Sequence, residues 1–456
     1  MKHPKDDGKH TIAKYEPYKA NTNADLASRF PAELIAQVIN LALPTPPPLP
    51  PPKGKDDPRL CLTQICQTWR NVAFSIHTLW NVCLDRVPTP GTIDLITSWL
   101  DQSSSTQLCL WGTEDLESPG EGDEHAEIKE YITGTLLAKH SSRVRELFMF
   151  PFVRHRLGAL QLDVLTTLSL DCSPGDYPGD LVVASFLRRV GLRDIFPPRD
   201  VRFLDNIPKI PWEQLEVLSF EGYLNLALLY EILLRCTSLK SLHINRISWD
   251  STGVPQTAVL DLPHLEELYV DIYKASIFHR LSMFNTPKLT SLTTNHPPDT
   301  PEILNGFISF LRGMKATLRR LELMFTMGND INTPIETLMC AIPFITHLSA
   351  KGQHIPPAII GQIGKGELLP LVEVLHVGPD NGGFWRPTLD LLIPDERQRT
   401  SRLREIHIYS SAISYDHLPR LGELRDYEIN VYIDHPEYPT RMEKDPEWIL
   451  RAGGDK

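Results

Sequence analysis

The sequence has little of what marks several large classes of protein. It contains only seven cysteines in 456 residues, an odd number at wide spacing and without a Cys-x-x-Cys pair, which argues against a zinc centre or a disulfide framework. No uncharged apolar run approaches the roughly 20 residues of a membrane helix. Lysine and arginine total 46 against 57 for aspartate and glutamate, a net charge of −11, so no global basic field attracts a nucleic-acid backbone. We therefore expect no metal, no cofactor, no membrane span and no nucleic-acid partner.

Catalytic motifs are missing as well. Gly361, Gly364 and Gly366 surround Lys365 but lack the spacing of a phosphate-binding loop. The 16 histidines include no His-Glu-x-x-His pair. Adjacent acids such as Glu266 and Glu267 fall on one expected strand, where neighbours point to opposite faces. We expect a protein that is not an enzyme; a hydrolase or transferase site assembled from distant residues is the remote alternative.

The two ends of the chain are expected to be tails. Lysines and acidic residues alternate in the first twenty residues without the apolar stretch of a secretory signal. We predict a disordered tail over 1–25, a C-terminal tail over 435–456, and a cytoplasmic or nuclear location, or both.

Proline, by contrast, is abundant, with 39 residues, seven of them in the segment 44–52. No helix crosses such a segment. Before it, the apolar positions of 31–43 repeat with helical spacing. After it, Asp57 and Pro58 suit the start of a second helix that ends near Ser75. We predict a helical domain over 26–84 with a proline-rich insertion at 44–57. The insertion is either a stiff loop or a polyproline ligand for an SH3-type groove.

Three motifs in this domain resemble the skeleton of the F-box family, in the form common in mushroom-forming fungi. They are Phe30-Pro31-Ala32-Glu33-Leu34-Ile35, Ile65-Cys66-Gln67-Thr68-Trp69-Arg70 and Leu79-Trp80. The resemblance implies that these helices bind the Skp-type adaptor of a cullin-RING ubiquitin ligase. The adaptor-binding residues that it implies are Pro31, Leu34, Ile35, Val38, Ile65, Trp69, Leu79 and Trp80, the last of which would also pack the helices onto the next domain. Phe30 replaces the usual leucine, and the proline run replaces a short link.

From residue 106 onward a short motif, apolar-x-x-apolar-x-apolar, recurs ten times. Its fourth positions lie 21 to 31 residues apart, except for one gap of 50 that holds a degenerate copy near 187–203; they are Leu147, Leu168, Leu218, Leu242, Leu268, Leu292, Leu321, Leu348, Leu375 and Ile406. Weaker strands are expected at 80–84 and 107–110, and a closing strand at 428–433. Helical faces such as Leu226, Leu229 and Leu233 lie between strands.

This rhythm resembles the leucine-rich repeat, which implies an α/β solenoid over 85–434 with parallel strands on its concave face and helices on its convex face. The asparagine or cysteine expected after the last apolar position is mostly missing. Prolines stand two residues before the first apolar position in four repeats, namely Pro263, Pro287, Pro343 and Pro370, where we expect them to stop a helix and favour an extended chain.

The fifth position of each motif alternates away from the buried leucines and should look out from the concave face. The positions are Phe148, Ser169, Ser219, His243, Tyr269, Thr293, Glu322, Ser349, His376 and His407. Of these we expect Phe148, His243, Tyr269, Glu322, His376 and His407 to bind a protein substrate. His347 shares that face, and the four histidines are either a source of pH-sensitive binding or passive.

Together these features predict a substrate-recognition subunit whose partners are a Skp-type adaptor, a cullin scaffold and an unknown protein substrate. The alternative is an interaction scaffold in which the N-terminal helices only cap the repeat array.

Overall fold

The computed structural model describes residues 30–42, 48–49, 62, 64–76, 82–84, 97, 101, 108–112, 138–149, 162–171, 185–193, 210–222, 224–245, 247–248, 259–271, 281, 283–295, 301–324, 335–351, 355–377, 401–409, 424 and 428–434. The chain forms two compact units, Met1–Ser118 and Pro119–Lys456. The division falls within the acidic segment 114–130 of the sequence. The fold is α/β, with extensive parallel pairing and few helices.

The first unit pairs two helices, α2 (Ala32–Ala42) and α4 (Gln67–Ser75), with short strands. Ile35 and Ile39 of α2 pack with Val72 and Ala73 of α4, and all four are buried. The strands β1 (Pro48–Leu49), β2 (Val82–Leu84) and β3 (Leu108–Gly112) pair in parallel in that order. The expected strands at 80–84 and 107–110 are thus confirmed, and two residues of the proline-rich segment pair as a strand.

The second predicted helix differs from the observed one. Cys66 has an extended backbone, with φ −161° and ψ 174°, and its carbonyl accepts the N–H of Arg70, so α4 begins only at Gln67. Gln64 is helical, whereas Ile65 and Cys66 are not, so the helical path is interrupted at these two residues. This break lies within the segment that we expected to be one continuous helix.

The second unit contains a parallel sheet whose strands follow one another in chain order. They are β4 (Val144–Met149), β5 (Thr167–Asp171), β6 (Arg189–Arg193), β7 (Val217–Glu221), β9 (Ser241–Ile244), β12 (Glu267–Val270), β14 (Ser291–Thr294), β15 (Arg320–Met324), β16 (His347–Lys351), β17 (Val374–Val377), β18 (Glu405–Tyr409) and β19 (Asn430–Asp434). Each of the ten repeated motifs supplies one strand. The degenerate copy supplies β6 and the closing segment supplies β19, as expected.

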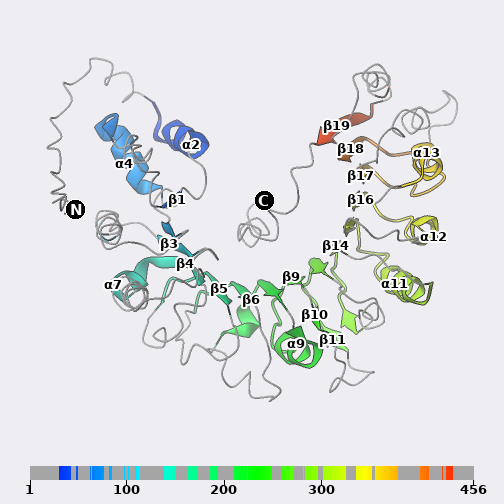
Figure 1. Cartoon of the computed structure of the whole chain (residues 1–456), viewed down its shortest axis with the longest axis horizontal. Coiled ribbons are helices and arrows are strands. Elements are labelled where there is room, and N and C mark those ends of the chain that lie inside the picture. Colours follow the sequence, from blue (N-terminus) through cyan, green and yellow to red (C-terminus); the bar gives the residue numbers. More distant parts are fainter. Residues whose placement is uncertain are drawn as a thin grey trace, which may run out of the picture. The chain divides into compact units, whose positions relative to one another are not determined.

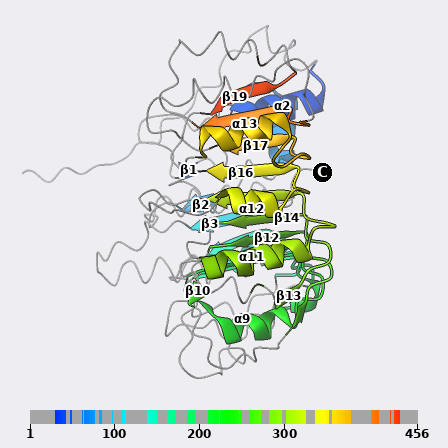
Figure 2. The ribbon, with the colours of Figure 1, turned by 90° about the vertical axis from the view of Figure 1, so that its right-hand side faces the viewer.

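Helices connect some of these strands and lie on one side of the sheet (Figures 1 and 2). They are α9 (Leu226–Leu233), α11 (Pro301–Gly313), α12 (Ile335–Ala341) and α13 (Pro357–Lys365). Their apolar stripes are buried, as Leu229, Phe307 and Leu338 show. A short helix α7 (Ala138–His140) and the 3₁₀ turns Ser141–Arg143 and Trp212–Gln214 precede β4 and β7.

Two further pairs of short strands lie within these connections. The strand β8 (Leu224–Asn225) pairs with β10 (Ile247–Ser248), and β11 (Leu260–Asp261) pairs with β13 (Phe284–Asn285), both in parallel. The connections of neighbouring strands therefore also contact each other.

The four prolines that precede repeat motifs lie in turns. The expected helix stop is seen at Pro343, two residues after α12 ends at Ala341. In each case the residue before the proline accepts a hydrogen bond from the residue two after it: Leu262 from Leu265 (3.2 Å), Thr286 from Leu289 (3.1 Å), Ile342 from Ile345 (3.2 Å) and Leu369 from Val372 (3.0 Å). Proline at the second position of such a turn fits its fixed φ. The prolines therefore sit in tight turns that lead into the strands, where an extended chain was expected.

Candidate functional site

The helix α2 is apolar on two sides. Its inner side buries Ile35 and Ile39, which are 1% and 0% exposed. A second stripe carries Leu34, Val38 and Leu41, which are 46%, 49% and 88% exposed. The spacing of three and four residues places these three side chains along one line of the helix. We call these three residues the apolar stripe. Phe30, before the helix, and Ile65, before α4, are also exposed.

Three of the adaptor-binding residues that the resemblance implied are exposed: Leu34 and Val38 in the apolar stripe, and Ile65 before α4. Pro31 is exposed at the start of the same helix and accepts the N–H groups of Leu34 and Ile35. Ile35 lies in the core and offers no surface to a partner. Trp69 is partly buried and packs against that core. Leu79 and Trp80 lie outside the described residues.

In the second unit the fifth positions of the repeats form one continuous row across the sheet. The residues in direct register are Phe148, Ser169, Gly191, Ser219, His243, Tyr269, Thr293, Glu322, Ser349, His376, His407 and Tyr432. The preceding and following residues of most strands are buried leucines, isoleucines or valines. The row therefore lies on the face of the sheet away from the helices, which we call the helix-distal face. The side chain of Phe148 is outside the described residues.

Two ring stacks lie on this row. The first pairs His243 with Tyr269, whose ring centroids are 3.8 Å apart at an interplanar angle of 29°. Desolvation by burial lowers the pKa of the His243 imidazole to about 3. This histidine is therefore neutral at physiological pH and acts as a flat apolar partner for the tyrosine.

The second stack joins three strands. His376 and His407 are nearly parallel, with centroids 4.2 Å apart and an angle of 3°, and His407 stacks in turn on Tyr432 at 4.6 Å and 18°. The carboxylate of Glu405 lies 3.8 Å from Nε2 of His407. We call these four residues the C-terminal stack.

Between the two stacks the row is polar. Glu322 is largely buried, with a side chain 12% exposed, and its carboxylate lies 4.0 Å from the guanidinium of Arg320 two residues earlier. Ser349 is next to His376 in register, and Ser219 is next to His243 on the other side of the first stack. Within the described part of the chain, their hydroxyl oxygens are buried without a hydrogen-bond partner.

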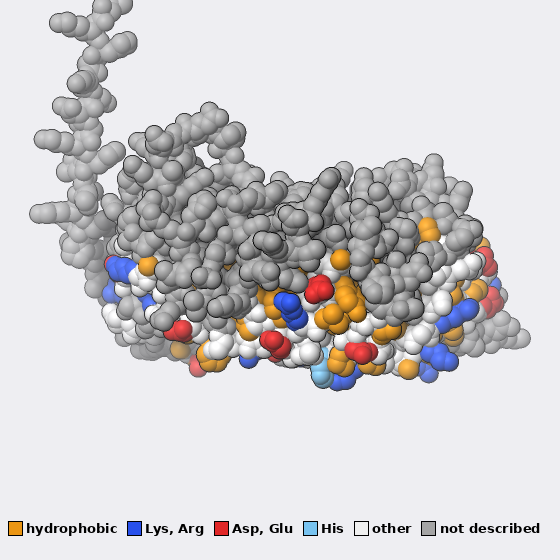
Figure 3. Space-filling model, turned by 90° about the horizontal axis from the view of Figure 1, so that it is seen from below, with side chains coloured by type: hydrophobic (Ala, Val, Ile, Leu, Met, Phe, Trp, Pro, Cys, Tyr) orange, Lys and Arg blue, Asp and Glu red, His pale blue; other side chains and the backbone are white. Residues whose placement is uncertain are grey.

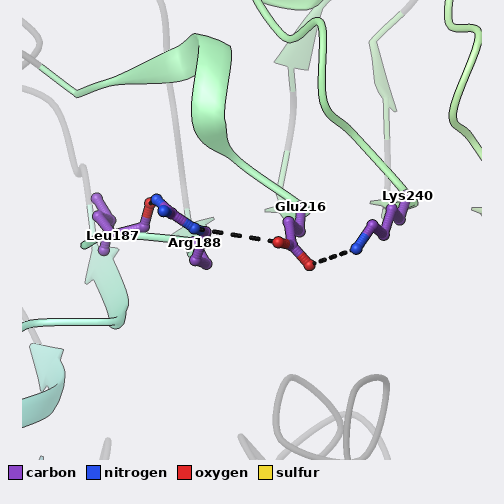
Figure 4. A network of polar contacts seen from close by, with 4 residues as sticks. All are labelled: Leu187, Arg188, Glu216 and Lys240. Carbon is purple, nitrogen blue, oxygen red and sulfur yellow. Dashed lines mark hydrogen bonds and ion pairs between the residues drawn. The ribbon is translucent and has the colours of Figure 1, made fainter. Parts of the chain in front are cut away.

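A second ordered row starts at Arg145 of β4 and continues with the residue before each strand from β5 to β18. From Thr166 to Arg404, each N–H of this row donates to the carbonyl of the previous member, at 2.7 to 2.9 Å. Charges alternate at its centre: Glu216 lies between Arg188 and Lys240, at 4.0 and 2.9 Å (Figure 4). Figure 3 likewise shows acidic and basic side chains interspersed on the face that it presents. Opposite charges on adjacent strands help to fix the register of the sheet.

Sequence reasoning missed two members of the C-terminal stack, Glu405 and Tyr432. Glu405 is the third position of its motif and lies two residues before His407 on the same strand. Tyr432 belongs to the closing strand, which lacks a complete repeat motif, so its fifth position was not identified. The signal that finds it is the alternation within Asn430-Val431-Tyr432-Ile433, which sets Tyr432 in phase with His407.

The described residues contain no group of three or more histidines, cysteines, aspartates or glutamates arranged to hold a metal ion. Burial, followed by the nearby Glu213 carboxylate, raises the pKa of the Cys236 thiol to about 12, so this cysteine is not a thiolate nucleophile at neutral pH. No helix in the same part of the chain has both the length and the apolar character needed to cross a bilayer.

Two apolar or aromatic surfaces, one in each unit, are thus the features that bear on function. No protein-family model matches this chain, and no curated protein matches it.

Proposed function

We propose that this chain is the substrate-recognition subunit of a cullin-RING ubiquitin ligase. In this proposal the first unit is an F-box-like segment that binds a Skp-type adaptor. The second unit is a leucine-rich-repeat solenoid that binds a protein substrate. Ubiquitin transfer belongs to the partner enzymes, and the chain itself is not an enzyme.

The observation that carries the proposal is the apolar stripe on α2. A helix in a small domain normally turns one apolar side to the core and a polar side to water. Here a second apolar line is exposed beside the buried one, in the segment whose residues resemble the F-box. Burying an exposed leucine or valine side chain gains roughly 1.5–3 kcal/mol, so a partner groove that covers Leu34, Val38 and Leu41 gains several kcal/mol from the stripe.

The pairing register of the strands supports the second part of the proposal, in which the second unit is a solenoid that binds a substrate. The parallel strands follow one another in chain order, and their fifth positions form one row on the helix-distal face. Parallel strands in repeat order with helices on one side are the arrangement of a leucine-rich repeat, in which the strand face carries the binding residues. The row varies in chemistry from strand to strand, as a surface that selects one substrate requires.

The test is co-purification of the full chain with a co-expressed Skp-type adaptor. We expect the wild-type chain to retain the adaptor and Leu34→Asp to lose it, because a carboxylate in the interface is left without a partner. The matched control is Asn40→Asp, which adds the same charge to an exposed position of α2 away from the stripe. Equal retention by all three proteins, or none by the wild type, contradicts the proposal and favours a scaffold whose helices only cap the repeats.

A further inference from the structure

We propose that the C-terminal stack is a recognition site for an arginine side chain of a partner polypeptide. This inference rests on the proposed function only in taking the helix-distal face as the face that meets a substrate. The site consists of Glu405, His376, His407 and Tyr432, contributed by β17, β18 and β19.

The accessible end of the stack is Tyr432. Its strand β19 is the last strand of the sheet within the described residues, and Tyr432 is 44% exposed. The ring of His407 covers one face of the tyrosine. A flat cation can therefore stack on the phenol ring from the side away from His407. The π face of tyrosine attracts such a cation.

The charge of the site matches the same ligand. Glu405 has a side chain 41% exposed and stands one strand from Tyr432, two residues before His407. Its carboxylate can accept two parallel N–H groups from a guanidinium, a geometry that an ammonium does not offer. The chain as a whole carries a net charge of −11, which attracts a basic segment.

The stack also supplies shape. His376 and His407 lie parallel within 3°. His407 in turn stacks on the ring of Tyr432, and this contact favours one orientation of the tyrosine. A rigid ring loses little conformational entropy when it binds. The two stacks also differ in their angle, because the rings of His243 and Tyr269 are 29° apart.

The experiment uses the full chain and fluorescent hexapeptides of sequence Gly-Ser-Xaa-Xaa-Gly-Ser, with Xaa as arginine, lysine, alanine or glutamate, followed by anisotropy. We expect affinity in the order arginine, lysine, alanine, with no binding of the glutamate peptide. Glu405→Gln should lower the affinity for the arginine peptide about fivefold. Tyr432→Leu should lower the same affinity about threefold. The matched control is Glu267→Gln, which removes the same charge from the same register position on β12 and should change affinity by less than about twofold.

Two results overturn the inference. Equal binding of the arginine and alanine peptides excludes a guanidinium site. Equal losses of affinity in Glu405→Gln and Glu267→Gln show only a general attraction of basic peptides to the negatively charged chain. Adaptor retention is measured on the same proteins: a chain that binds the arginine peptide but no adaptor loses the ligase proposal and keeps this one.

Discussion

The two units bury their apolar residues in different ways. In the first, the described core is a cluster of Ile35, Ile39, Val72 and Ala73, and a second apolar stripe on the same helix stays exposed. In the second, most strands from β5 to β18 turn two apolar residues inward. The comparison teaches that the strands of the second unit bury their apolar residues against their own unit, whereas α2 of the first unit leaves one apolar side exposed.

The largest effect is expected from truncation in the core of the second unit. Phe220 of β7 is 1% exposed, and Phe220→Ala should lower the free energy of unfolding by about 3–5 kcal/mol because it leaves a cavity. Urea denaturation followed by circular dichroism measures the change. Phe186→Ala, at an exposed position of the same unit, is the control and should stay within about 0.5 kcal/mol of the wild type.

The second prediction separates the two sides of α2. Ile39→Ala removes a fully buried side chain and should destabilise the first unit by about 2–4 kcal/mol. Leu41→Ala, two residues later on the exposed stripe, should change stability by less than about 0.5 kcal/mol and should weaken adaptor binding. Thermal unfolding and adaptor retention are measured on both variants. A Leu41→Ala protein as unstable as Ile39→Ala would mean that the stripe belongs to the core.

The third prediction concerns acid stability. The pKa of His243 is about 3 in the folded chain and 6.5 is its ordinary value, so the unfolded chain binds an extra proton between these pH values. Stability from this residue is complete above pH 6.5 and is lost as the pH falls toward 3, by up to about 1.4 kcal/mol per pH unit. His243→Phe should keep the stack with Tyr269 and flatten this dependence in denaturation curves taken from pH 7 to pH 4. An unchanged slope would show that His243 protonates freely in the folded chain.

The smallest effect is expected at the charged row before the strands. Glu216→Gln removes the partner of both Arg188 and Lys240. Because these side chains are 40% to 53% exposed, the loss should stay under about 1 kcal/mol and should shrink at high salt. Denaturation at low and high ionic strength tests this, and a loss of several kcal/mol would mark the row as structurally essential.

The repeat could be predicted from the sequence because its signal is local. Alternation of apolar residues within each motif indicates where a strand lies and which of its residues face inward. The strands from β4 to β18, including the irregular β6, could therefore be predicted. Helices with a clear apolar stripe, such as α9 and α11, were predictable for the same reason.

Features that depend on neighbours distant in sequence were not predictable. The stack of His376, His407 and Tyr432 arises because connections of different lengths return to the same register. Ile35 and Leu34 are adjacent apolar residues on one helix, and only the position of α4 decides which of them is buried. The apolar spacing continues through Cys66, so the spacing alone does not reveal the break there.

The most direct test of the account is hydrogen exchange of the full chain with and without a Skp-type adaptor. We predict added protection in the peptides that cover residues 30–42 and Ile65, with the strands of the second unit unchanged. Protection that is absent, or that appears only along the sheet of the second unit, would contradict the assignment of the apolar stripe as the adaptor surface.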